Sequence, residues 1–459
     1  MPASYNTDPS SYRDPSGFIF QKDGILYRQV NLSFREDFDH FIKRGCYDKL
    51  KEQGLIIGHK TLAENITGSP DHYQTLQPEP IPFISYPYEW SFDMLKDAAL
   101  LTLRLVREAL NYEMILKDAT PYNIQYREGK MVFIDTLSFA KYNPEEPWIA
   151  YRQFCECFLS PLLLMHYSGQ PLQQMLLAWP EGIPIAVTRS LLPRRTRWSI
   201  HIYLHIHLHA KLSRKKDEPA NSKALFSKKK LLNLLMSLEI AIGKCKAPSQ
   251  PTAWSDYYSD ASGRDDYLEQ KNRIISEWLK KMNGIQSAID MGANRGEFSK
   301  LVADRKIPVL ATDLDQSSIN QLYLDIKSKK ERFIQPLVLD ISNPSPAMGL
   351  QNAERTSFTD RAHFDLVMAL AIVHHLAIGK NIPLVRIADI FQQIGKQLII
   401  EFVPKEDEKV KQMLSVKKDI YPGYTETEFE KAFRTYFTID SKDPIPGSGR
   451  TLYLMTKHV

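Results

Sequence analysis

The stretch from Ala288 to Ser299, AIDMGANRGEFS, limits what this chain can fold into more than any other part of it. The segment Ile285 to Ile289, which is apolar at 285, 288 and 289, leads into it, and the apolar residues after it recur at helical spacing. Gly292 to Gly296 is therefore expected to form a turn between a strand and a helix. Glycine allows a tight backbone there, and Asn294 tolerates a left-handed conformation. A ligand should bind above this turn.

The spacing of this turn, D-x-G-x-x-x-G, bears on the kind of ligand. A dinucleotide would need a G-x-G-x-x-G turn for its pyrophosphate, whereas a nucleoside without phosphates would not. Asp290, at the strand end, would repel a phosphate but could hold an ammonium or an amino-acid moiety. The pattern therefore favours S-adenosylmethionine, a sulfonium with an amino-acid tail.

Polar residues also end the next three predicted strands. The strand from Pro308 ends in Asp313, about twenty residues beyond the first glycine, where a carboxylate meets ribose hydroxyls in nucleotide-binding folds. The strand Phe333 to Leu339 is followed by Asp340, and the strand Phe364 to Leu370 leads to His374 and His375. Four strand ends in this order predict a doubly wound α/β sheet with a ligand at its carboxyl edge.

With these residues in place, the last third of the chain resembles the class I S-adenosylmethionine-dependent methyltransferases. The resemblance implies a seven-stranded, Rossmann-like sheet and S-adenosylmethionine as cofactor. It is similar to a subgroup that includes the host-specificity nodulation methyltransferases, and the tail Ile400 to Asp407 resembles theirs too. By this resemblance the cofactor-binding residues are Asp290, Gly292, Ala293, Asn294, Gly296, Asp313, Leu314, Asp340 and Ile341.

Methyl transfer from a sulfonium requires the donor and acceptor to be held in line and, for a protonated acceptor, a base. His374, His375 and Glu401, which ends the fifth strand, are the candidate catalytic residues. No Asp/Asn-Pro-Pro-Tyr motif follows the fourth strand, so a small-molecule or carbohydrate acceptor is favoured over a nucleic-acid base. An RNA methyltransferase using the basic 194–230 region remains the alternative, as does a non-catalytic or bifunctional protein.

The N-terminal half contains a second informative segment, Leu116 to Asp135. It resembles the catalytic loop of kinase-like folds, where a D-x-x-x-x-N segment supplies a base and a metal ligand. By this match Asp118, Asn123 and Asp135 would take those roles. No glycine-rich phosphate loop or strand lysine accompanies them. We therefore expect an α+β, kinase-like remnant that serves structure or recognition and does not transfer phosphate.

Between the two halves lie a histidine cluster and a basic region. His201, His205 and His209 would share one helical face, but the surrounding apolar residues favour a packed helix, and no metal site is predicted. The basic residues of 194–230 could contact nucleic acid or a membrane surface, with a solvated linker as the simpler interpretation.

The length of 459 residues suggests two to three domains. We predict an N-terminal domain at 1–246, a linker and lid helix at 247–283 in which Tyr257 and Tyr258 could cover the cofactor, and a methyltransferase domain at 284–459. No secretory signal or membrane-spanning apolar run is evident, and the cysteines are too few for a disulfide scaffold, so a cytoplasmic protein is expected. No pattern indicates an oligomeric state.

Overall fold

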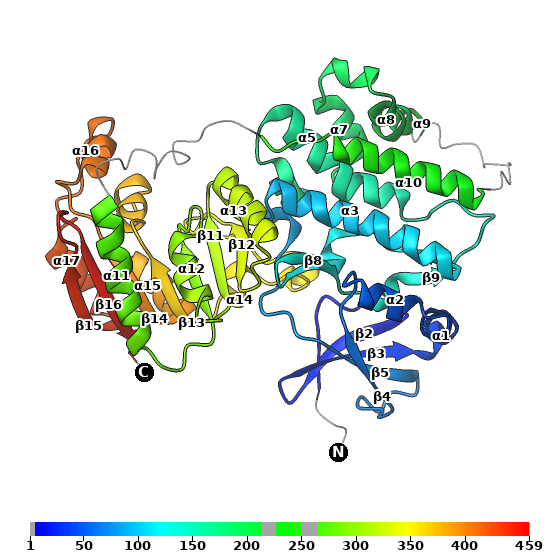
Figure 1. Cartoon of the computed structure of the whole chain (residues 1–459), viewed down its shortest axis with the longest axis horizontal. Coiled ribbons are helices and arrows are strands. Elements are labelled where there is room, and N and C mark those ends of the chain that lie inside the picture. The colour runs from blue at the N-terminus through cyan, green and yellow to red at the C-terminus, as the bar shows by residue number, and fades with distance from the viewer. Residues whose placement is uncertain (1–4, 213–225, 249–264, 459) are drawn as a thin grey trace. The chain divides into compact units, whose positions relative to one another are not determined.

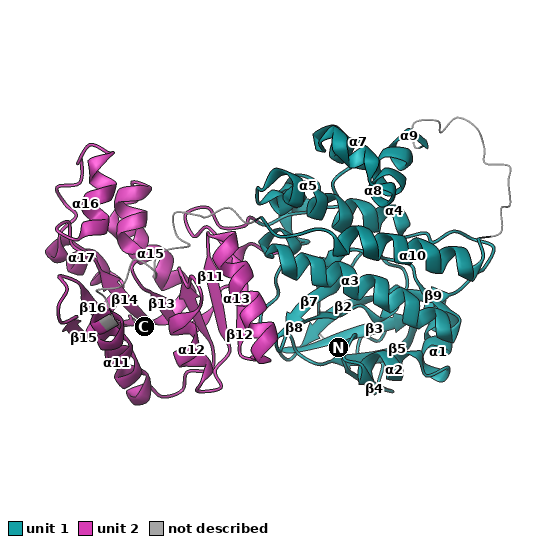
Figure 2. Ribbon diagram, turned by 45° about the horizontal axis from the view of Figure 1, so that its top comes forward, with its two compact units in different colours: residues 1–249, 347–355 teal, residues 250–346, 356–459 magenta. Residues whose placement is uncertain are grey.

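The computed structural model describes residues 5–212, 226–248 and 265–458. The chain divides into two compact units, coloured separately in Figure 2. Unit 1 comprises 1–249 and 347–355, and unit 2 comprises 250–346 and 356–459. The division near residue 249 lies close to the predicted boundary at 246, but nine residues of the predicted methyltransferase domain, 347–355, group with unit 1.

Unit 1 begins with a five-stranded antiparallel sheet in the order β1-β2-β3-β5-β4. Asp23 and Gly24 join β2 to β3, and both have positive φ, of 52° and 75°, as a two-residue hairpin turn requires. An Asp-Gly pair favours such a turn, and β2 pairs antiparallel with β3 across it. The strands are β1 (Asn6–Thr7), β2 (Gly17–Lys22), β3 (Ile25–Asn31), β4 (His59–Leu62) and β5 (His72–Pro78).

The rest of unit 1 is mainly helical (Figure 1). The long helix α3 (Phe92–Ala109) buries one apolar face and packs beside α10 (Lys228–Gly243). The other helices are α1 (Arg35–Lys43), α2 (Cys46–Glu52), α4 (Tyr151–Phe154), α5 (Ser160–Ser168), α6 (Met175–Ala178), α7 (Ile185–Leu191), α8 (Ile200–Ile202) and α9 (His209–Leu212). Two short strand pairs complete the unit: β6 (Met114–Leu116) with β9 (Phe139–Lys141), and β7 (Ile124–Arg127) with β8 (Lys130–Phe133).

Unit 2 is built on a seven-stranded sheet in the order β12-β11-β10-β13-β14-β16-β15. The first five strands of this order are parallel, and β16 pairs antiparallel with both β14 and β15. The strands are β10 (Ala288–Met291), β11 (Val309–Asp313), β12 (Ile334–Val338), β13 (Phe364–Ala369), β14 (Gly395–Phe402), β15 (Phe437–Pro444) and β16 (Thr451–Lys457). The order reverses between β10 and β13, which is where ligands bind in open parallel sheets.

Helices cover both faces of this sheet. On one face α11, α12 and α13 share a core with the sheet, in which Ile275 and Trp278 of α11 pack with Leu366 and Ile399. On the other face Phe391 and Phe433 stack between α15 and α17, and Phe429 contacts Tyr453 of β16. The helices are α11 (Asp265–Lys281), α12 (Glu297–Ala303), α13 (Gln316–Lys329), α14 (Phe358–Arg361), α15 (Leu384–Ile394), α16 (Glu408–Ser415) and α17 (Glu426–Phe433).

Candidate active site

A pocket in unit 2 opens at the carboxyl ends of β10, β11, β12 and β13. It encloses about 1090 Å³, counting the space open to solvent, and is lined mainly by apolar side chains, as ligand pockets usually are. Six of the nine predicted cofactor residues and one of the predicted catalytic residues line it: Gly292, Asn294, Asp313, Leu314, Asp340, Ile341 and His375. The parallel strands bring these residues together although they span more than eighty positions of the chain.

The turn after β10 has the conformation that its glycines predict. Gly292, Asn294 and Gly296 have positive φ, of 74°, 50° and 76°. The amides of Gly292 and Ala293 donate hydrogen bonds to the carbonyl of Thr312 on β11, at 2.8 and 2.9 Å. A Cβ at position 296 would lie 2.8 Å from the Leu322 side chain. The turn is therefore fixed against β11 and leaves its outer surface to the pocket.

Asp313 and Asp340 present carboxylates along the pocket. One oxygen of Asp313 accepts the amide of Asn294 at 2.9 Å and the other accepts the amide of Asp315 at 2.8 Å. These bonds fix the carboxylate at the strand end, and burial raises its pKa above the ordinary value. Asp340 accepts the amide of Ser342 at 2.9 Å, and its other oxygen lies 3.6 Å from Nζ of Lys380.

Three predicted cofactor residues do not line the pocket: Asp290, Ala293 and Gly296. Asp290 is 1% exposed and accepts a 2.6 Å hydrogen bond from the Ser299 hydroxyl on α12. Burial raises the pKa of Asp290 to about 6. Its carboxylate holds the first turn of α12 against β10. This contact fixes the two ends of the glycine turn, which connects β10 to α12.

The two candidate histidines occupy different environments. His375 lines the pocket, whereas His374 is completely buried, and neither of its ring nitrogens has a hydrogen-bond partner. Their ring centroids are 4.0 Å apart. Burial lowers the pKa of His375 to about 4 and that of His374 well below its usual value. Both imidazoles are therefore neutral at neutral pH, and only His375 is placed to accept a proton from a pocket ligand.

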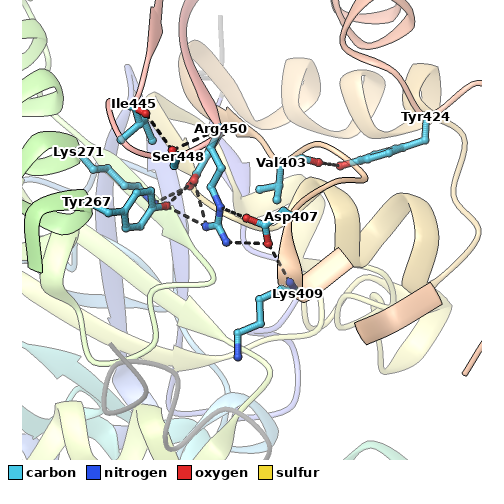
Figure 3. Close-up of polar contacts among 10 residues, drawn as sticks. Tyr267, Lys271, Val403, Asp407, Lys409, Tyr424, Ile445, Ser448 and Arg450 are labelled. Atoms are coloured by element: carbon cyan, nitrogen blue, oxygen red, sulfur yellow. Dashed lines mark hydrogen bonds and ion pairs between the residues drawn. The ribbon is translucent and has the colours of Figure 1, made fainter. Parts of the chain in front are cut away.

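The third candidate, Glu401, is completely buried and does not line the pocket. Figure 3 shows part of the ion-pair network around it, in which Arg450 contacts both Tyr267 and Asp407. The oxygens of Glu401 accept hydrogen bonds from the Tyr267 hydroxyl and the Lys271 ammonium, both at 2.6 Å. Arg450 reaches it at 3.3 Å and pairs with Asp407 at 2.8 Å. With both oxygens held by these donors, Glu401 fixes α11 over the sheet and is not free to take a proton from an acceptor.

The sequence predicted a lid helix within 247–283, but it did not indicate which residues of α11 reach the pocket. Tyr267 and Lys271 both line the pocket, and the Lys271 ammonium also lies 4.6 Å from the centre of the Phe298 ring. A signal was present in the sequence, because Lys271 falls within the apolar stripe that Leu268 and Ile275 define. A lysine in a buried stripe requires a carboxylate partner, which only the fold supplies. Tyr257 and Tyr258, the suggested lid residues, lie outside the described residues.

In unit 1 the kinase-like residues form a closed polar cluster. Asp118 accepts hydrogen bonds from Gln153 at 2.6 Å and from Asn123 at 3.0 Å. Asp135 accepts one from the Ser138 hydroxyl at 2.6 Å and pairs with the Arg28 guanidinium of β3 at 2.5 Å. A guanidinium thus stands against the carboxylate that would bind a metal ion in a kinase.

The histidine cluster is likewise held by internal hydrogen bonds. His205 is bonded through its two ring nitrogens to the hydroxyls of Tyr151 and Ser237, both at 2.8 Å, and His201 also contacts Ser237. Within the described parts of the chain, no group of three or more histidine, cysteine or acidic residues could hold a metal ion. None of the described helices has the length and hydropathy to cross a membrane.

Comparison with known proteins gives a full-length relative. No family model matches the chain. Nodulation protein NoeA of Rhizobium meliloti (strain 1021) is 32% identical over 459 residues, which cover 96% of this chain and 94% of that protein. The chain belongs to the NoeA family. The similarity to NoeA extends over both units of the chain.

Solved structures similar to this NoeA-family chain include methyltransferases at low identity. N-methyltransferase NodS from Bradyrhizobium japonicum WM9 is 11% identical, with a TM-score of 0.31, over 42% of this chain and 98% of that chain. A SAM-dependent methyltransferase from Aquifex aeolicus is 14% identical, with a TM-score of 0.31, over 45% and 100%. The bifunctional kinase-methyltransferase WbdD is 15% identical, with a TM-score of 0.27, over 44% of this chain and 42% of that one.

The sheet itself identifies the fold. Five parallel strands that reverse order between β10 and β13, followed by an antiparallel β16 inserted beside β14, make the class I methyltransferase sheet. The fold expected from the sequence is confirmed. S-adenosylmethionine is the cofactor of this fold. The residues present fit it, because a carboxylate stands at the end of β11 and Gly292, which has no Cβ atom, faces the pocket.

Proposed function

We propose that this NoeA-family chain is an S-adenosylmethionine-dependent methyltransferase whose acceptor is a small molecule or a carbohydrate. The observation that carries the proposal is the position of Asp313. Its carboxylate is fixed at the end of β11 by two backbone amides and lines the same pocket as the glycine turn and His375. This is where a carboxylate can accept hydrogen bonds from both hydroxyls of a ribose.

The remaining pocket residues give the cofactor an orientation. Asp340 and Ile341 follow β12, on the far side of Asp313 from the glycine turn, so they are placed for the adenine. The amino-acid tail then points toward Gly292 and α11. Lys271, which gives one hydrogen bond to Glu401, supplies the cation there that a ligand carboxylate would meet.

The chain's part in the reaction is positioning and proton removal. The cofactor supplies a methyl group activated by a sulfonium. The pocket holds the acceptor in line with that methyl group and excludes water, and proximity of this kind is worth several kcal/mol of the barrier. His375, neutral because of its burial, accepts the proton that an oxygen or nitrogen acceptor loses.

An RNA acceptor is the alternative. The residues after β13 are Leu370, Ala371 and Ile372, which line the pocket and offer no side-chain hydrogen bonds to the edge of a base. Base-modifying enzymes read a flipped base by hydrogen bonds to that edge. The apolar wall therefore supports the small-molecule or carbohydrate acceptor.

Isothermal titration of the full chain with S-adenosylhomocysteine tests the cofactor site. Asp313→Ala should weaken binding roughly 10- to 100-fold, because each hydrogen bond to a charged group contributes about 1.5–3 kcal/mol. Lys271→Met should weaken the binding of S-adenosylhomocysteine. The same variant should bind methylthioadenosine, which lacks the amino-acid tail, as tightly as the parent does.

The exposed acid Asp304 of unit 2 provides a matched control. Asp304→Ala should bind the cofactor product like the parent. If the parent chain binds neither S-adenosylhomocysteine nor S-adenosylmethionine, the proposed function is wrong. If Asp313→Ala binds as well as Asp304→Ala, the ribose assignment is wrong even though the pocket is a cofactor site.

A further inference from the structure

Unit 1 exposes an unusual number of large apolar side chains in one short segment. Trp198 is 92% exposed, Ile200 68% and Leu212 60%, and Leu191 and Leu204 are exposed as well. Single exposed apolar residues are ordinary, but several within one segment mark an interaction site. We refer to the exposed residues of 191–212 as the 191–212 patch.

The helical part of the patch has a sharply divided surface. Ile202, His205, Ile206, His207 and Ala210 are buried against the rest of unit 1. Ile200, Leu204 and Lys211 are exposed and follow one another at intervals of four and seven residues along the same continuous helical segment. Intervals of four and seven place side chains on one side of a helix, and the exposed Leu212 comes next to Lys211 at the end of the segment.

The same segment carries a concentrated positive charge. Arg194, Arg195, Arg197 and Lys211 are exposed, and no aspartate or glutamate occurs anywhere in 185–212. Arg195 lies over the Tyr167 ring at 5.5 Å. Among the described residues no ion pair involves any of these four cations, so their charge is not neutralised by the fold.

The short elements that carry these residues pack on one another. The 3-10 turn Arg194–Trp198 contacts α8 and the π-helical turn Tyr203–Leu208, and α7 contacts α9. Exposed apolar side chains and exposed arginines therefore lie within one small region of unit 1. Tryptophan beside arginine, with aliphatic residues on the same exposed side, is the composition of segments that lie in a lipid headgroup layer.

We propose that the 191–212 patch binds the surface of a membrane that contains anionic lipids. The arginines and Lys211 attract the headgroups, while Trp198, Ile200 and Leu212 enter the boundary between headgroups and acyl chains. Nucleic acid is the less suitable partner, because Trp198 is the one aromatic side chain among the exposed residues of 191–212 and could stack with a single base. Ile200, Leu204 and Leu212 would stay exposed to water beside a phosphate backbone.

Vesicle flotation of the full chain tests this proposal. The parent should float with vesicles of phosphatidylcholine and phosphatidylglycerol, much less with phosphatidylcholine alone, and less as salt is raised. Replacing Arg194, Arg195 and Arg197 together by glutamine should weaken binding about 100-fold, since each basic residue near an anionic surface contributes about fivefold. Trp198→Ser should weaken binding about tenfold.

The matched control replaces three exposed cations on another surface of unit 1, Arg44, Lys49 and Lys51, by glutamine. This variant should bind vesicles like the parent. The proposal is overturned if the parent does not bind anionic vesicles, or if both triple variants lose binding equally. Binding of single-stranded RNA that depends on Arg194, Arg195 and Arg197, without vesicle binding, would instead assign the patch to nucleic acid.

Discussion

Each unit contains a set of acidic residues at or near the ends of strands, and the surroundings of the two sets differ. In unit 2 the carboxylates of Asp313 and Asp340 line a pocket. In unit 1 the carboxylates of Asp118 and Asp135 are held by Gln153, Asn123, Ser138 and Arg28. The first set therefore lines a pocket, whereas the second set is engaged by partners within unit 1.

The source of the hydrogen-bond donors explains the difference. Backbone amides fix Asp313 and leave its remaining lone pairs for a ligand, because each amide supplies a single N–H from one side. Side chains, including a full positive charge from Arg28, surround Asp135. A metal ion would have to displace that guanidinium. Acidic residues at motif spacing can therefore bind a ligand or a metal ion only where their hydrogen-bond partners in the fold leave carboxylate oxygens accessible.

Breaking the internal pair of unit 1 should have the largest effect. Arg28→Met leaves the mostly buried Asp135 carboxylate without its cation, and we expect the free energy of unfolding of unit 1 to fall by about 3 kcal/mol. Urea unfolding followed by circular dichroism measures the change.

The double variant Arg28→Met with Asp135→Asn provides the control for that measurement. It removes both charges and should recover much of the lost stability, since an uncompensated charge costs more than the absence of the pair. Equal losses in the single and double variants would mean that Arg28 contributes through packing and not through its charge.

A somewhat smaller effect is expected from acid. Burial lowers the pKa of His205 to about 4, with smaller contributions from His201 and His209. The unfolded chain takes up a proton near the ordinary pKa of about 6.5, whereas the folded chain does not, so stability falls as pH decreases between these two values. At about pH 5 the loss due to His205 should be about 2 kcal/mol.

Urea unfolding at about pH 7 and about pH 5 measures this loss. His205→Gln should lose less stability between the two conditions than the parent, and His458→Gln, at an exposed position, should lose as much as the parent. An identical pH dependence in all three proteins would show that His205 is not the acid-sensitive group.

The smallest effect is expected from a change at Asp118, the residue that would be the catalytic base if unit 1 were an active kinase. Asp118→Asn keeps the size of the side chain and should change neither cofactor binding by unit 2 nor Mg²⁺-dependent ATP hydrolysis, which we expect to be undetectable in the parent. A phosphate-release assay with the purified chain checks this. If the parent hydrolyses ATP and Asp118→Asn abolishes that activity, the protein is bifunctional. The acidic residues of unit 1 would then be accessible to a ligand after all.

Sequence patterns predicted the parts of the fold that local rules control. The glycine turn after β10 and the succession of strands from β10 to β14 follow from residue spacing and turn chemistry. Capping is equally local, and Thr425 accepts the Glu428 amide at the start of α17.

The parts that depend on distant residues could not be predicted. Glu401 is a plausible base in the sequence, yet Tyr267, Lys271 and Arg450 surround it from segments more than forty residues away. Arg28 meets Asp135 across more than one hundred positions. Pairs of this kind set which charged residues remain available for chemistry, and a single sequence carries no direct sign of them.

The place of β16 in the sheet has a consequence for how unit 2 is made. This strand lies between β14 and β15, and Arg450, just before it, completes the ion-pair network that holds α11 to Glu401. During synthesis β14 is exposed along one edge until β16 leaves the ribosome, because β15, which is made earlier, has no place beside it. The ion pairs that hold α11 against the sheet can therefore form only after residue 450, one of the last to be synthesised, is available. A ribosome-bound nascent chain that stops before residue 450 would expose a hydrophobic strand edge, which makes this intermediate a natural client for chaperones.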